Sequence, residues 1–162
     1  MDWPDIAILI VTYDRPREIR TTIDALLRFV SYDGQVHWHI ADDKSPGEYI
    51  PNLKADYPQL EMTVTQTNRK GWGANVNKAY RYILSILKCD YVFLCEDDYV
   101  AKTMIDLPRG VALMERVKNV GLVRYDGIAA HVGLVLRVQE AKDTLAGRID
   151  YLTIDRHASQ HL

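Results

Sequence analysis

Two uninterrupted apolar runs restrict the fold of this chain more than any other feature. The first run spans Ile6 to Val11 and is mostly β-branched, and the second spans Tyr91 to Cys95. A strand that is apolar at every position needs cover on both of its faces, as in a parallel sheet flanked by helices. The two runs therefore predict central strands of a layered α/β domain.

Segments with the apolar spacing of helices alternate with strand-like segments along the first hundred residues. This alternation implies right-handed crossovers between parallel strands, so the carboxyl ends of the strands should meet at one edge of the sheet. Ligands of such sheets bind at that edge. The expected strands cover residues 6–11, 36–41, 62–65 and 91–95, and the expected helices begin near Pro16, Tyr49 and Val76.

The periodicity is less regular in the last third of the chain. No repeat, linker or low-complexity segment divides the sequence, so a single domain is expected over residues 1–162. The elements expected in the last third are helices over residues 104–118 and 139–145 and strands over residues 120–124, 131–138 and 149–154.

Composition excludes some classes of protein. The formal net charge is −2, so the chain lacks the basic excess that binds a nucleic-acid polymer. Cys89 and Cys95 lack the spacing of a metal site and are expected as reduced thiols of a cytoplasmic protein. No apolar stretch approaches the roughly 20 residues of a membrane span, and the first residues lack the basic start of a signal peptide. Peripheral membrane contact stays open.

Three consecutive acids, Glu96, Asp97 and Asp98, follow the second apolar run directly. Adjacent carboxylates repel one another and resist burial without a cation or hydrogen-bond donors. Because Mg²⁺ and Mn²⁺ take one or two carboxylates together with substrate phosphates, the acids predict a metal–diphosphate site. A solvated acidic turn that caps the next helix explains them equally well.

Three other polar segments also flank the expected strands, and each has two interpretations. Thr12-Tyr13-Asp14 suits contacts with a base and a ribose, or a helix cap at Asp14. Asp42-Asp43 suits acceptance from a nucleobase or a ribose, or an Asx-type turn. Arg69-Lys70 suits phosphate binding beside a helix amino terminus, or a basic surface loop.

Taken together, these segments resemble the GT-A fold of family 2 glycosyltransferases, a Rossmann-like three-layer sandwich around a mainly parallel central sheet. The similarity covers about residues 5–100. ILIVTYDRP is similar to the opening strand of the family and its Thr-Tyr-Asn/Asp-Arg-Pro turn. HIADDKS resembles the Val-Asp-Asp-Gly-Ser motif, with Lys44 in place of the usual glycine.

Two further motifs carry the resemblance. NRKGWGANVNKAY resembles the Asn-x-Gly and Ala-x-Asn-x-Gly segment of the family, with one extra residue and with Ala79 for the last glycine. FLCEDDYV resembles the strand that ends in the Asp-x-Asp metal motif, with Glu96 as its first acid. Each motif alone is degenerate, but four motifs in this order and spacing are specific.

The resemblance implies metal-dependent, inverting transfer of a sugar from a nucleotide-diphosphate donor, with a UDP-sugar favoured, to a hydroxyl of a glycan or other acceptor. By position, Asp98 would ligate Mn²⁺ or Mg²⁺, Asp97 would lie near the donor ribose or sugar, and Glu96 would support the site. Asp43 would accept from the base, most often uracil N3–H. The other expected nucleotide-sugar residues are Thr12, Tyr13, Asp14, Asp42, Asn68, Arg69 and Asn77.

In this family the catalytic base is a carboxylate on the acceptor side, which deprotonates the acceptor hydroxyl. Its usual Glu-Asp context is absent here, and the candidates are Asp126, Asp150 and Asp155, with a surface turn as the alternative for each. Residues 1–100 are therefore expected as the donor-binding half and residues 101–162 as a partial acceptor-side region. A further domain of the same chain would complete a larger enzyme.

Other classes of protein account for the sequence less well. A sugar nucleotidyltransferase usually has a glycine-rich basic loop after its first strand, and residues 12–16 contain no glycine. An aspartyl phosphohydrolase needs Asp-x-Asp there, and a dinucleotide-binding enzyme needs G-x-G-x-x-G. A non-catalytic sugar-nucleotide-binding module stays open, because fold does not determine function.

Overall fold

A computed structural model describes residues 3–117, 122–127 and 130–137 of the chain. The strands are β1 (Ile6–Thr12), β2 (Val30–Ser31), β3 (Val36–Asp42), β4 (Thr63–Gln66), β5 (Tyr91–Glu96), β6 (Ile105–Asp106), β7 (Leu122–Gly127) and β8 (Ala130–Arg137). The helices are α1 (Pro16–Phe29), α2 (Tyr49–Asp56), α3 (Trp72–Tyr82), its π-helical continuation η1 (Ile83–Leu87), and α4 (Leu107–Arg116).

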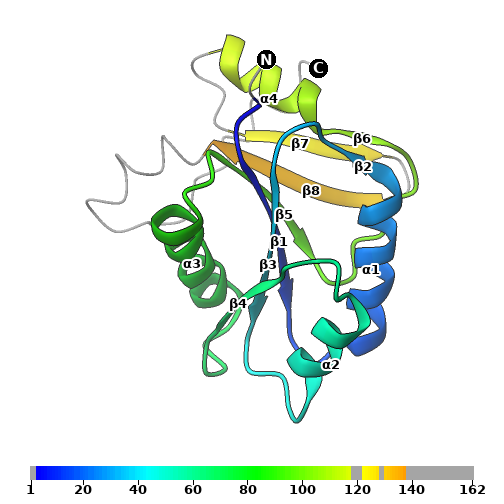
Figure 1. The fold of residues 1–162 in the computed structure, drawn as a ribbon, viewed down its shortest axis with the longest axis vertical. Coiled ribbons are helices and arrows are strands. Elements are labelled where there is room, and N and C mark those ends of the chain that lie inside the picture. Colours follow the sequence, from blue (N-terminus) through cyan, green and yellow to red (C-terminus); the bar gives the residue numbers. More distant parts are fainter. Residues whose placement is uncertain (1–2, 118–121, 128–129, 138–162) are drawn as a thin grey trace.

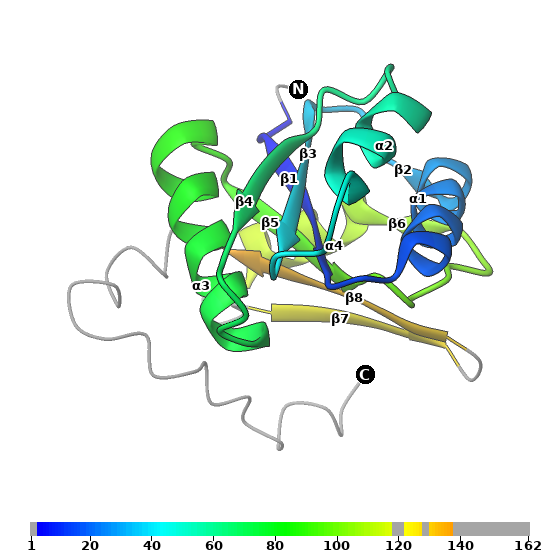
Figure 2. The same cartoon turned by 90° about the horizontal axis from the view of Figure 1, so that it is seen from below.

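Six of these strands form one sheet in the order β4-β3-β1-β5-β8-β7 (Figure 1). Five of the six run in the same direction, and β8 runs against its neighbours β5 and β7. Helix α3 covers one face of the sheet and helices α1 and α2 cover the other, as the view from below shows (Figure 2). The expected three-layer α/β sandwich with a mainly parallel sheet is therefore confirmed.

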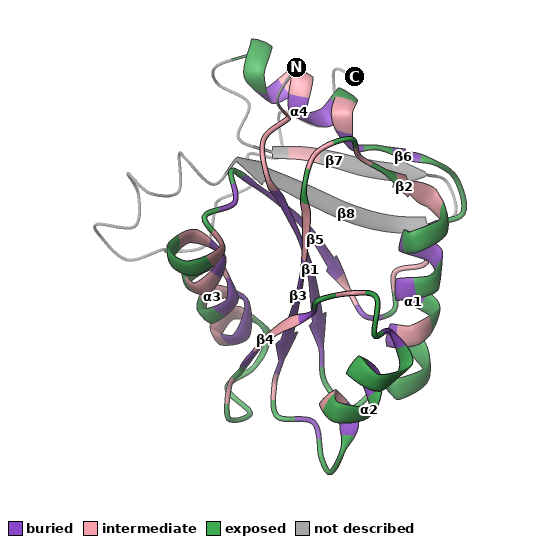
Figure 3. Cartoon of the chain, in the orientation of Figure 1, coloured by how far each residue is buried: buried purple, intermediate pink, exposed green. Residues whose placement is uncertain are grey.

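The central strand β1 separates two apolar cores. Its even-numbered residues, Ile6, Ile8 and Ile10, pack in a cluster with α1, α2 and α4, whereas its odd-numbered residues pack against α3 and η1. Every residue of β1 is buried, and the buried colour runs unbroken along the middle of the sheet (Figure 3). Because successive side chains point to opposite faces, a strand with two cores must be apolar throughout.

Helix α1 begins as the sequence predicts but without the expected cap. Pro16 occupies its first turn, where the missing N–H costs nothing. The residue before it, Arg15, makes no side-chain capping hydrogen bond, and the backbone of Asp14 has a positive φ of 50°. The helix-cap interpretation of Asp14 is therefore not supported, and another role for its side chain is open.

The structure differs from the expected elements mainly around α4. Strands β2 and β6 form a short parallel pair that the sequence did not predict, with Val30 opposite Ile105. Helix α4 consequently starts at Leu107 rather than at residue 104, and the Asp106 side chain caps it by accepting from Arg109 N at 2.9 Å. The helix and strand expected over residues 139–145 and 149–154 lie outside the described residues.

Candidate functional site

The carboxyl ends of β1, β3, β4 and β5 lie side by side at one edge of the sheet. In the strand register, Thr12 is opposite Asp42 and Val11 is opposite Glu96. The Asp97 amide extends the pairing past the end of β5 by donating to Val11 O at 3.1 Å. The polar segments that the sequence places after these strands therefore meet in space.

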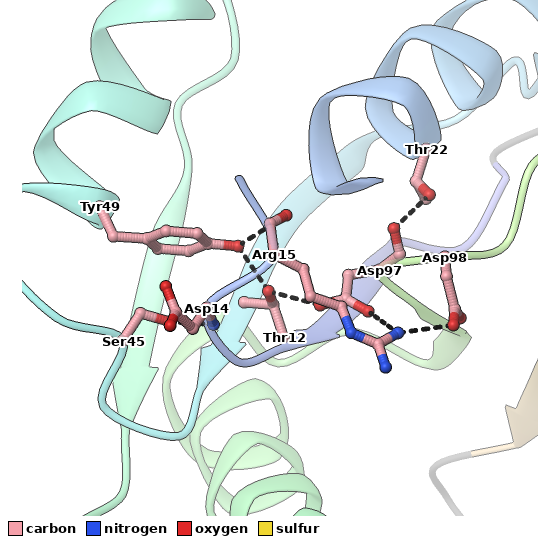
Figure 4. Close-up of polar contacts among 8 residues, drawn as sticks. All are labelled: Thr12, Asp14, Arg15, Thr22, Ser45, Tyr49, Asp97 and Asp98. Atoms are coloured by element: carbon pink, nitrogen blue, oxygen red, sulfur yellow. Dashed lines mark hydrogen bonds and ion pairs between the residues drawn. The ribbon is translucent and has the colours of Figure 1, made fainter. Parts of the chain in front are cut away.

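Asp97 is the most enclosed of the three consecutive acids. Thr12 Oγ1 donates to Asp97 Oδ2 at 2.8 Å and also lies 2.5 Å from Tyr49 Oη, while Thr22 Oγ1 donates to the Asp97 carbonyl at 2.7 Å (Figure 4). Burial raises the pKa of Asp97, although the Thr12 hydrogen bond and the charge of Arg15 oppose that rise. Thr12 thus holds the carboxylate directly, Thr22 holds the backbone of Asp97, and Tyr49 acts through Thr12.

Arg15, immediately before α1, is the cation that these acids face. Its Nη1 lies 2.6 Å from Asp98 Oδ2 and 3.4 Å from Asp97 Oδ1 (Figure 4). Half of the Arg15 side chain (50%) and 44% of the Asp98 side chain are exposed. The hydrogen bond to Asp98, followed by the charge of Asp97, raises the pKa of Arg15. The guanidinium stays charged and bridges two of the three carboxylates.

Glu96 ends β5 and is half-buried beside the other two acids. Burial raises the pKa of Glu96, and the charges of Asp98 and Asp97 raise it further. One guanidinium therefore faces three carboxylates, which leaves excess negative charge at this edge of the sheet. Such an arrangement favours the approach of an additional cation.

These groups fit a divalent cation that is shared with a ligand. Over the parts of the chain that the structure describes, no three His, Cys, Asp or Glu side chains are grouped to hold a metal ion by themselves. Mg²⁺ and Mn²⁺ commonly take only one or two protein carboxylates and fill the other positions with water and phosphate oxygens. Asp98 is exposed, and its carboxylate offers oxygen ligands to a metal ion. It already pairs with one cation, the Arg15 guanidinium, which also contacts Asp97 Oδ1.

Asp42 organises the loops at this edge. It is fully buried, both of its carboxylate oxygens accept from Ser45 N at 3.1 Å, and Oδ2 also accepts from Gln66 Nε2 at 2.7 Å. Ser45 Oγ in turn accepts from Asp14 N at 2.8 Å. The Asp42 side chain thus bonds the amide three residues on, one residue further than in the Asx-turn that the sequence offered as one interpretation. The turn ties the loop after β3 to the loop after β1.

Asp43 holds the loop before α3. Its Oδ1 accepts from Lys70 N at 3.0 Å and its Oδ2 from Gly71 N at 2.9 Å, and the Thr67 hydroxyl also donates to Oδ1. Burial opposes ionisation of Asp43, but these hydrogen bonds outweigh it and lower its pKa. The carboxylate therefore stays charged at the amino-terminal end of α3, where the helix dipole also favours it.

Two side-chain contacts connect the remaining expected residues. The Arg69 guanidinium lies over the Tyr13 ring, 4.9 Å from its centroid, and Lys44 Nζ donates to Asn68 Oδ1 at 2.8 Å. Tyr13 nevertheless keeps 37% of its surface exposed. The loops after β1, β3 and β4 are thus joined pairwise into one polar surface.

Helix α3 carries a buried amide, Asn75, in addition to the expected nucleotide-sugar residue Asn77. Asn75 Nδ2 donates to Ala41 O at 2.8 Å, and its Oδ1 has no hydrogen-bond partner within the described part of the chain. Asn77 lies two residues further along the same helix and is half-buried. The sequence signal for Asn75 was its position four residues before Ala79, on the apolar face of the helix.

The sequence did not single out Arg15, Thr22 or Tyr49, which all contact the acids or their partner Thr12. Arg15 carried one signal, because it is the cation nearest to the first strand end. Thr22 and Tyr49 reach the site only through the packing of α1 and α2 on the sheet. Helical periodicity shows which face is buried, but it does not show which distant residue that face meets.

Of the expected catalytic carboxylates, only Asp126 lies in a described element. It belongs to β7 and is opposite His131 in the register with β8. Strand β7 runs in the same direction as β5, so Asp126 is near the end of β7 that points to the carboxyl edge of the sheet. Asp150 and Asp155 lie outside the described residues.

Comparison with known proteins identifies the family of this chain. The chain matches the family model described as Glycosyl transferase family 2 over residues 7–153, and it belongs to that family. The GT-A fold that the sequence resembles is confirmed by the solved structures that are similar to this chain.

Two solved structures illustrate the similarity. The mannosyltransferase PcManGT from Pyrobaculum calidifontis, in complex with GDP-Man and Mn²⁺, has a TM-score of 0.68 and 16% sequence identity, over 90% of this chain and 49% of that chain. S. aureus TarS 1–349 in complex with UDP-GlcNAc has a TM-score of 0.60 and 15% identity, over 86% of this chain and 47% of that chain. This chain therefore spans about half the length of those neighbours.

A search of curated proteins found no match to the chain. No helix within the described ranges has the length and apolar character needed to cross a membrane.

Proposed function

We propose that this chain is the donor-binding half of a metal-dependent, inverting glycosyltransferase that takes its sugar from a nucleotide-diphosphate donor, with UDP-sugars favoured. The observation that carries the proposal is that Thr12, Asp43 and the acids from Glu96 to Asp98 meet at one edge of the sheet in a family 2 chain. Solved neighbours with bound GDP-Man and Mn²⁺, or with UDP-GlcNAc, support the same chemistry.

The nucleoside would bind against the loops after β1, β3 and β4. Asp43 is ionised and its Oδ2, which accepts from Gly71 N, can accept a second hydrogen bond from a base N–H or a ribose hydroxyl. The Tyr13 ring, with Arg69 over it, offers an aromatic surface for the base. Thr12, which donates to Asp97 Oδ2, and Asp14, whose amide donates to Ser45 Oγ, would complete the nucleotide pocket.

The diphosphate would bind beside Asp98. A bound Mn²⁺ or Mg²⁺ there would supply the positive charge that stabilises the leaving diphosphate. Asp98 would hold that ion, Asp97 would face the donor ribose or sugar, and Glu96 would maintain the negative potential of the site. The Thr12 and Thr22 hydroxyls keep the chain at Asp97 in place, so that the carboxylates need little reorganisation when the donor arrives.

Other expected residues act by holding the loops. Asp42 fixes the turn that carries Ser45, and Asn68 accepts from Lys44. Asn77, on α3, is proposed to contact the donor from the helix side. The donor surface would therefore be formed by three loops that hold one another in place.

The acceptor side would come from residues 101–162 together with further chain. Asp126, at the end of β7, is the candidate base that removes the proton from the acceptor hydroxyl of a glycan or other substrate. Attack in line with the departing diphosphate inverts the anomeric carbon. Residues 1–100 would be the donor half and residues 101–162 a partial acceptor region.

A non-catalytic sugar-nucleotide-binding module is the second candidate, and the absence of the usual Glu-Asp context of the catalytic base from the sequence favours it. Slow hydrolysis of a UDP-sugar or GDP-sugar in the absence of acceptor separates the two functions, because only an enzyme activates the donor.

The state of the cysteines bears on the cellular location of the protein. Both cysteines are free and buried, which supports a reducing compartment such as the cytoplasm.

Thermal unfolding with UDP, GDP and dTDP, each with and without Mn²⁺, tests the proposal directly. A ligand at a hundred times its dissociation constant raises the free energy of unfolding by about 2.7 kcal/mol, which is readily measured. Stabilisation by one nucleotide only when Mn²⁺ is present is the expected result, and it would also identify the donor base. No stabilisation by any pair would refute donor binding by this chain.

Asp98→Asn should remove the metal-dependent part of that stabilisation, because a neutral amide is a poor ligand for a hard cation. The matched control is Asp33→Asn, since Asp33 is an exposed acid in the turn between β2 and β3, at the opposite edge of the sheet. The control should bind nucleotide and Mn²⁺ as the wild type does. Equal binding by both variants would contradict the role of Asp98.

A further inference from the structure

We propose that Arg15 is an internal counterion, which occupies the place of the divalent cation against Asp97 and Asp98 until a nucleotide diphosphate draws it away. Metal and nucleotide would then bind cooperatively, each favouring the other. This inference rests on the proposed donor site, and it adds a positioning role for a residue that the site itself does not require.

The contacts of the Arg15 guanidinium indicate that it competes with a metal ion for Asp98. Arg15 Nη1 reaches Asp98 Oδ2 at 2.6 Å and Asp97 Oδ1 at 3.4 Å, so one nitrogen bridges the two acids. The shorter of these contacts is to Asp98, the carboxylate that would hold the divalent cation. A guanidinium and a metal ion cannot both contact the same face of Asp98, because their like charges would repel at that distance.

The backbone of Arg15 is held, whereas its side chain is not enclosed. Its carbonyl accepts from Ile19 N at 3.1 Å and from Tyr49 Oη at 3.5 Å. On either side, Asp14 N is bonded to Ser45 Oγ and Pro16 has a restricted φ. With half of the side chain exposed, the guanidinium can turn about a fixed backbone without disturbing the loops.

A nucleotide diphosphate offers Arg15 a better partner than a half-exposed carboxylate. Arginine binds phosphate oxygens through two parallel N–H groups, and such charge-assisted pairs are stronger than a single contact. When the diphosphate binds beside Asp98, the guanidinium can move to its oxygens and free the carboxylate for the metal. Since coupling between two ligands is reciprocal, metal binding must favour nucleotide binding by the same factor.

Binding of Mn²⁺ in the absence of nucleotide tests this role, with the EPR signal of free Mn²⁺ as the readout. Arg15→Gln should bind Mn²⁺ about three- to tenfold more tightly than the wild type, because a competing ion pair and a nearby positive charge are both removed. The factor by which Mn²⁺ strengthens binding of UDP or GDP should fall by a similar amount. Arg15→Lys, which keeps the charge without the planar fork, should lie between the two.

The matched control is Arg17→Gln, which removes the same charge from the exposed first turn of α1. It should leave Mn²⁺ binding as in the wild type, and an equal gain in this variant would overturn the counterion role in favour of a general charge effect. In the double variant Arg15→Gln with Asp98→Asn, the gain in Mn²⁺ affinity should disappear, since the gain acts through Asp98.

The possible results also separate this inference from the proposed function. If the wild type binds nucleotide in a metal-dependent way but Arg15→Gln and Arg15→Lys bind Mn²⁺ no more tightly than it does, the counterion role is wrong and the donor site stands. If the wild type binds neither Mn²⁺ nor any of the nucleotides, both the donor site and the counterion role are wrong.

Discussion

Lys44 occupies a backbone conformation that suits glycine. Its φ is +65°, and the family 2 motif that this segment resembles has glycine at the same position. Asp14 and Arg69, in the two neighbouring loops, also have positive φ, at 50° and 51°. A side chain in this left-handed region costs about 1–2 kcal/mol. Residues in all three loops of the proposed donor surface therefore carry backbone strain.

Lys44→Gly should be more stable than Lys44→Ala by about 0.5–1 kcal/mol, once the greater freedom of glycine in the unfolded chain is subtracted. Both variants lose the bond from Lys44 Nζ to Asn68, so their difference isolates the strain at Cβ. Urea unfolding of the two proteins measures it. Equal stability of the two variants would mean that the loop relaxes around alanine.

For single residues of the candidate site, the sequence allowed prediction from side-chain chemistry and from position after an expected strand. Glu96, Asp97 and Asp98 could be assigned to a strand end because three acids directly follow an apolar run. Arg15 could not be placed against them, since its distance from Asp98 along the chain gives no measure of their separation in space. Ion pairs between loops are set by the sheet register, which local patterns do not encode.

Single elements were predicted best where one periodicity runs without interruption. Helix α1 shows this, because Ile19, Ile23 and Leu26 form one buried stripe against the sheet, although Leu27, which has the same apolar spacing, remains exposed. The short pair formed by β2 and β6 could not be predicted in the same way. Two-residue strands have no period, and their pairing depends on how α1 and α4 are packed.

Ile23→Ala should lower the free energy of unfolding by about 2–5 kcal/mol, because it leaves a cavity between α1 and the sheet. Ile23 is completely buried. The control on the same helix is Leu27→Ala, since Leu27 is 44% exposed, and the expected loss is below about 1 kcal/mol. Chemical denaturation of both variants gives the comparison, and similar losses would argue against the packing of α1 seen here.

The order of the strands is a property of the whole molecule, and the sequence predicted it only in part. Alternating strands and helices indicated parallel neighbours, which β1, β3, β4 and β5 confirm. The reversed strand β8, inserted between β5 and β7, could not be foreseen because a hairpin and a crossover leave similar apolar patterns. The acceptor-side region therefore stayed the least predictable part of the chain.

His39 makes the stability of the whole domain depend on pH. It is completely buried on β3, between Thr63 and Thr65 on β4, and it stacks on Tyr82. Burial lowers the pKa of His39 from its usual 6.5 to about 4. Between these two values the unfolded chain binds more protons than the folded one, so stability is lost as the pH falls.

This histidine should contribute a loss of about 2 kcal/mol in the free energy of unfolding between pH 7 and pH 5. His39→Gln should remove that part of the pH dependence. The control is His37→Gln on the same strand, which leaves His39 in place and should show the same pH dependence as the wild type. Urea unfolding at several pH values provides the measurement. An unchanged pH dependence in His39→Gln would show that other groups are responsible.

The central position of β1 also has a consequence for synthesis on the ribosome. Strand β1 is made first, and β3 can pair with one of its edges soon afterwards, but β5, which pairs with the other, emerges only after three helices and two more strands. During that interval an apolar strand edge lies open on the nascent chain, the kind of edge that invites wrong pairing. Slow translation before Tyr91 should therefore increase the dependence of this protein on chaperones.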